Sequence, residues 1–66
     1  MNQADRALAD FDTSLALQPG NARAYLWRSG EKLQLGDRSG ALRDALRARA
    51  LGYAVDDGYL DRLRKP

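Results

Sequence analysis

The sequence predicts an all-α protein, a short α-solenoid of about four antiparallel helices. Ala, Leu and Arg dominate the composition, and Thr13 and Val55 are its only β-branched residues. Turn-forming clusters lie at residues 19–21, 36–37 and 52–57. Between these clusters apolar residues recur every three or four positions, which is the period of an amphipathic helix. Because the connections are short, we expect successive helices to pack antiparallel.

The first expected helix spans residues 3–17, or 3–18 with its last turn. Its apolar face consists of Ala4, Ala7, Leu8, Phe11 and Leu15. The second spans residues 22–35. Asn21 is suited to cap its first turn, and Gly36 can adopt the left-handed conformation that ends a helix.

The third expected helix spans residues 38–51, and either Asp37 or Ser39 caps it. Its apolar face consists of Ala41, Leu42, Ala45, Leu46 and Ala48. The fourth is short, from 57 to 64, with Asp56 as its cap. Its inner face consists of Tyr59, Leu60 and Leu63.

Length and composition exclude several classes of function. A chain of 66 residues is a single domain that buries only about 60% of its unfolded surface. It contains no Cys and no His, so the commonest metal ligands and the commonest general base are absent. We therefore expect no catalysis, cofactor or metal site. The sequence has no apolar run long enough to span a membrane and no visible signal peptide. It does not indicate the cellular compartment of the protein.

The sequence also matches itself at a displacement of 34 residues. Eight of the 32 compared positions are identical, where random pairing would give roughly two. The matched residues are Ala7-Leu8 with Ala41-Leu42, Asp10 with Asp44, Ala16-Leu17 with Ala50-Leu51, Tyr25-Leu26 with Tyr59-Leu60, and Arg28 with Arg62. This period indicates a helical repeat.

A helix–turn–helix unit of this length resembles the tetratricopeptide repeat (TPR) family. The residues that resemble it are Ala7, Phe11, Ser14-Leu15, Leu17, Pro19, Tyr25, Ser29, Gly36-Asp37, Ala41 and Ala48. Arg28, Lys32 and Ala45 depart from the family's usual Leu, Tyr and larger apolar residue. The resemblance implies one domain over 1–66. Its parts are the second helix of a partial repeat (3–18), a complete repeat (22–51) and a capping helix (56–64).

In this family the first helix of each repeat lines a concave surface on which ligands lie. The residues that the resemblance places in this groove are Arg23, Leu26, Trp27, Gly30, Leu33 and Gln34, continued by Leu60 and Asp61. Trp27 is either an aromatic anchor for a ligand or an ordinary core residue. Because Trp27 stands where carboxylate-binding members have Asn, we expect no such clamp.

The resulting expectation is a non-catalytic protein–protein interaction module that binds a peptide or helix segment. The alternative is a structural fragment that caps a longer array or forms a homodimer, since an array needs about three repeats. Its self-association surface would be Leu8, Phe11 and Leu15, which would otherwise face water.

The charged residues favour no nucleic-acid partner. Acidic and basic residues are interspersed, and the exposed arginines lack an accompanying aromatic platform. Arg23, Arg28 and Lys32 would suit an acidic peptide, but we expect them to be solvated surface charges. The repeated pairs Tyr25/Arg28 and Tyr59/Arg62 are expected to stack and to seat successive helices.

Overall fold

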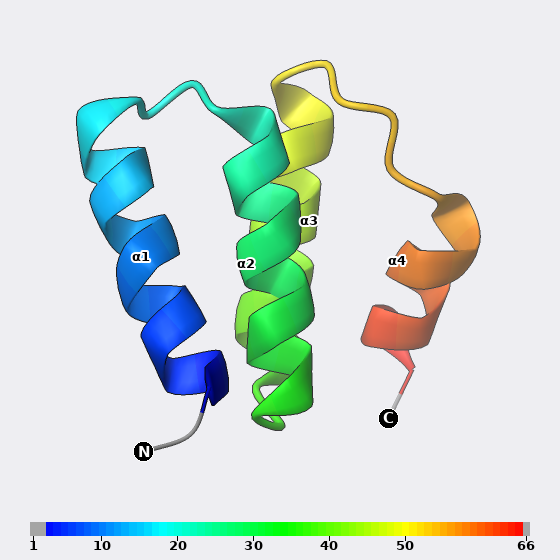
Figure 1. Cartoon of the computed structure of the whole chain (residues 1–66). Helices are drawn as coiled ribbons and strands as arrows, with labels where there is room; N and C mark the ends of the chain where they lie inside the picture. Colours follow the sequence, from blue (N-terminus) through cyan, green and yellow to red (C-terminus); the bar gives the residue numbers. More distant parts are fainter. Residues whose placement is uncertain (1–2, 66) are drawn as a thin grey trace.

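A computed structural model describes residues 3–65, apart from the side chains of Ala4 and Asp5. These residues form four helices and no strand: α1 (Gln3–Leu17), α2 (Ala22–Gln34), α3 (Arg38–Ala50) and α4 (Asp57–Arg64) (Figure 1). The all-α prediction is confirmed, and each helix begins and ends within one residue of its expected bounds. We expected the side chain of Ala4 on the apolar face of the first helix, and that side chain lies outside the described part of the structure. Residues 1, 2 and 66 of the expected domain also lie outside it.

Consecutive helices run antiparallel, and α2 packs against both α1 and α3, while α4 packs against α3 (Figure 1). The Cα atoms fill a slab of 28 × 28 × 13 Å. In Figure 1 α3 lies behind α2, and α1 and α4 flank this pair on opposite sides. The face of α2 that points away from α3 is therefore free, with α1 on one side of it and α4 on the other.

Three side chains begin the helices as expected. Asn21, Asp37 and Asp56 each accept a hydrogen bond from the backbone N–H three residues later, at 3.3, 2.9 and 3.2 Å. Of the two candidates for α3, Asp37 is the cap, and Ser39 lies inside the helix. These bonds satisfy N–H groups that have no partner within the helix, which fixes where each helix starts.

Glycines end α2 and α3. Gly36 and Gly52 have φ of 84° and 96°, a conformation that residues with a Cβ rarely adopt. At the end of α2 the N–H of Gly36 bonds to the Leu33 carbonyl at 3.0 Å, and that of Asp37 to the Lys32 carbonyl at 2.8 Å. This pair of bonds is the Schellman motif, and it leaves only three residues between α2 and α3.

The main core lies where α3 meets α4. Ala41 and Ala45 are fully buried against Leu60 and Leu63. Two small side chains on α3 let the two leucines of α4 fill the space between the helices. Leu46 is 37% exposed, so its expected place on the inner face of α3 is wrong.

No helix within residues 3–65 is both long enough and apolar enough to cross a membrane.

Candidate functional site

The free face of α2 forms the floor of an open groove of about 770 Å³. Phe11 of α1 lies on one side, and the segment between α3 and α4 with the first turn of α4 lies on the other. The lining residues are Phe11, Leu26, Trp27, Gly30, Glu31, Gln34, Tyr53, Ala54, Val55, Asp56 and Tyr59. A mainly apolar concavity of this size, with a few polar groups, is typical of a binding site.

Four of the expected groove residues line it: Leu26, Trp27, Gly30 and Gln34. Three do not. Arg23 is exposed outside the lining, Leu33 packs against the core, and Leu60 is 1% exposed and belongs to the core itself. Leu60 was expected on the groove side of α4, but its side chain is buried against α3 instead. Asp61 also lies outside the lining.

Sequence reasoning missed one wall of the groove. Tyr53, Ala54 and Val55 belong to the irregular segment before α4, which has no periodicity to show which way its side chains point. Glu31 was also missed, although it lies four residues after Trp27 and hence on the same side of the helix. That spacing was a usable signal.

Trp27 is the most exposed aromatic side chain in the groove lining. The sequence left it as either an anchor for a ligand or an ordinary core residue. It is 54% exposed, which favours the anchor over the ordinary core residue. Its ring lies 6.0 Å from that of Phe11 at a tilt of 52°, and the Arg23 guanidinium lies 5.8 Å from the indole centroid. These two neighbours hold the indole in place while leaving half of it accessible.

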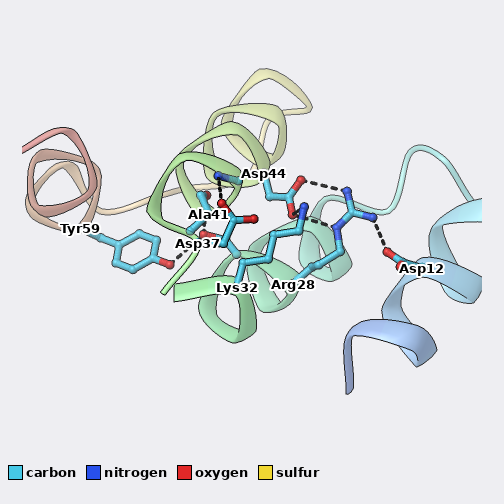
Figure 2. A network of polar contacts seen from close by, with 9 residues as sticks. Asp12, Arg28, Lys32, Asp37, Ala41, Asp44 and Tyr59 are labelled. Atoms are coloured by element: carbon cyan, nitrogen blue, oxygen red, sulfur yellow. Dashed lines mark hydrogen bonds and ion pairs between the residues drawn. The ribbon is translucent and has the colours of Figure 1, made fainter. Parts of the chain in front are cut away.

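Behind this surface Arg28 forms a charged network between three helices (Figure 2). Its Nε and Nη2 donate to the two carboxylate oxygens of Asp44 in α3, at 2.8 and 2.9 Å. Its Nη1 donates to Asp12 in α1 at 2.7 Å, and Lys32 approaches Asp44 at 3.1 Å. The expectation that Arg28 and Lys32 are solvated is wrong, because both are turned toward a carboxylate that is 4% exposed.

The network shifts the ionisation of both partners. Burial alone would raise the pKa of Asp44, but hydrogen bonds from Arg28 and Lys32, together with their charges, outweigh it and lower the pKa below 3.8. The hydrogen bond to Asp44 raises the pKa of Arg28, with Asp12 adding to the effect against desolvation. The carboxylate and the guanidinium therefore remain charged near neutral pH.

Ser29 makes a second polar junction directly beside the first. Its side chain is fully buried, and its Oγ donates to the Ala41 carbonyl of α3 at 2.6 Å. The Tyr59 hydroxyl of α4 lies 2.8 Å from the same Oγ, so it donates to that oxygen (Figure 2). Because Tyr59 also lines the groove, this bond holds one wall of the groove in position.

The two expected Tyr/Arg pairs differ. Arg28 lies over the ring of Tyr25 at 5.4 Å, as expected. Tyr59 instead bonds to Ser29, and no stacking of Arg62 on Tyr59 occurs among the described residues. The 34-residue match therefore does not give α2 and α4 the same contacts.

The expected self-association surface is largely covered within one chain. Leu15 is 7% exposed, so it does not face water as the expected surface required, and the helix that carries it packs against α2. Leu8 and Phe11 are half-buried, and Phe11 is part of the groove. The most exposed large apolar side chain on α1 is Leu17, at 78%.

Among the side chains that the structure describes, no group of three or more acidic residues is placed to hold a metal ion. Comparison with protein-family models, curated proteins and solved structures found no match for this chain.

Proposed function

We propose that this chain is a non-catalytic interaction module that binds an extended or helical peptide segment in the groove on α2. The single observation that supports this proposal most is the half-exposed Trp27 in a concave, mainly apolar surface. Exposed aromatic side chains at the centre of a concavity are the residues that contribute most to binding a partner protein. The TPR resemblance of the sequence agrees with a role of this kind.

The binding energy would come from burial of an apolar side chain of the partner against Trp27 and Phe11. The groove is preformed, since Trp27 packs on Phe11 and the opposite wall is held by the bond from Tyr59 to Ser29. A rigid site loses less conformational entropy on binding, which raises affinity.

A selection from a random dodecapeptide library on the immobilised protein tests the proposal. Peptides enriched on the wild type should bind the Trp27→Ala variant at least about tenfold more weakly, the effect of losing more than about 1.4 kcal/mol at an anchor. Leu17→Ala is the matched control, because Leu17 is also exposed and apolar but lies outside the groove.

Circular dichroism of both variants would verify that each stays folded. The proposal fails if no peptide is enriched, or if the enriched peptides bind the wild type and Trp27→Ala with equal affinity.

A further inference from the structure

We propose that the segment bound in this groove carries a Lys or Arg side chain close to its apolar anchor. This inference rests on the proposed function and adds the chemistry of the partner. The groove lining contains two carboxylates, Glu31 and Asp56, and no Lys or Arg. The whole chain, by contrast, has a net charge of +2. The groove is thus an acidic site on a basic molecule, which selects a cationic partner.

Glu31 is available to a ligand. Its side chain is half-buried on α2 next to Gly30, and it makes no ion pair within residues 3–65. A carboxylate beside apolar walls is less screened by water than one on an open surface, so its attraction for a cation is stronger.

Asp56 brings the second carboxylate from a different wall. Its Oδ2 accepts the N–H of Tyr59 as the cap of α4. Its Oδ1 is left for another donor, and no basic side chain pairs with Asp56 in the part of the chain described. A ligand ammonium or guanidinium group can donate to this oxygen without disturbing the cap.

The order of side chains along α2 also gives the ligand a direction. Arg23, Trp27 and Glu31 follow one another at intervals of four residues, so a basic, an aromatic and an acidic group lie on successive turns of one face. Arg23 already lies over the indole of Trp27. It repels a second cation there, and the ligand's basic residue is therefore directed toward Glu31, with its apolar anchor at Trp27.

The charge composition of the selected peptides tests this inference. On the wild type, enriched peptides should contain an excess of Lys or Arg within two positions of a large apolar residue. This excess should disappear on a Glu31→Gln/Asp56→Asn variant, in which Asn still caps α4. It should persist on the matched variant Asp10→Asn/Asp61→Asn, whose two exposed carboxylates lie outside the lining and whose net charge rises equally from +2 to +4.

Affinities follow from the fluorescence of Trp27, the only Trp of the chain. Replacing the basic residue of the strongest peptide, chosen free of Trp, by Gln should weaken binding to the wild type about three- to tenfold, as expected for partly screened ion pairs. The same replacement should change affinity less than twofold on Glu31→Gln/Asp56→Asn.

Two results would overturn the inference while leaving the proposed function intact: neutral or acidic peptides enriched with the same dependence on Trp27, or a Lys preference equal in both double variants. A third concerns a second copy of the chain as occupant. If Trp27 emission shifts to the blue as the free protein is concentrated through the micromolar range, the groove takes another copy and the inference is wrong.

Discussion

Arg28 and Ser29 are adjacent in α2 but join different neighbours. Arg28 bonds to Asp12 of α1 and Asp44 of α3, and Ser29 bonds to the backbone of α3 and to Tyr59 of α4 (Figure 2). Through two consecutive side chains, α2 is thus hydrogen-bonded to all three of the other helices, α1, α3 and α4. Each buried polar atom of these junctions has a partner, which avoids the desolvation penalty of an unpaired group.

Asp44→Asn should destabilise the protein by about 1–3 kcal/mol. The change removes the charge that Arg28 and Lys32 share, but these side chains are 18% and 25% exposed and can regain some hydration, so the loss is below the range for a fully buried pair. Urea unfolding followed by circular dichroism measures it. Asp12→Asn is the control, because Asp12 is 63% exposed and its pair with Arg28 should be worth less than about 1 kcal/mol. Equal losses in the two variants would contradict this account.

At the scale of the helices, sequence was sufficient for the bounds and insufficient for the contacts. Caps such as Asn21 and glycines such as Gly36 act within a few residues, so their effect is visible in the local sequence. Asp44 and Arg28 lie 16 residues apart on different helices, and the pattern of either helix alone does not show that they meet.

The groove was predicted only in part, because one of its walls depends on long-range packing. Leu26, Trp27, Gly30 and Gln34 share a face of one helix, and the TPR resemblance is what placed that face in a groove. The opposite wall depends on where the segment between α3 and α4 lies relative to α2, and on the rotation of α4 that buries Leu60. Both follow from long-range packing, which a local pattern does not contain.

At the element scale, Gly30 and Gly40 should respond differently to replacement by alanine. Gly30→Ala should stabilise α2 by about 0.5–1 kcal/mol, since a Cβ there meets nothing within 4 Å and Ala is the better helix former. At Gly40 a Cβ would lie 2.3 Å from the Asp37 carboxylate that caps α3. Displacing this cap costs about 1 kcal/mol and cancels the gain.

Thermal unfolding of the two variants checks this contrast. The midpoint should rise for Gly30→Ala and stay level or fall for Gly40→Ala, and an equal rise in both would show that the cap bond of Asp37 contributes nothing. The Gly30 variant has a second use, because its added methyl group lies in the groove and should weaken peptide binding while the fold gains stability.

At the scale of the whole molecule, acid acts on the contacts that join the helices. The helices are joined mainly through neighbours in sequence. Among the ion pairs of residues 3–65, the network of Arg28 is the one in which a side chain of α2 bonds to both α1 and α3. Arg28 keeps its charge at every accessible pH, because its pKa is raised. The acid response of the network is therefore determined by its carboxylates.

The stabilisation from Asp44 should be lost in acid. Its folded-state pKa is lowered, so the folded protein binds fewer protons than the unfolded chain, and the contribution is fully present above the ordinary value of 3.8 and disappears as the pH falls through the lower folded value. The difference in unfolding free energy between wild type and Asp44→Asn should thus be constant from about pH 7 to 5 and shrink below about pH 4. Urea titrations at matched ionic strength measure it, and a gap that stays the same down to pH 2.5 would mean that the ionised Asp44 does not hold α2 and α3 together.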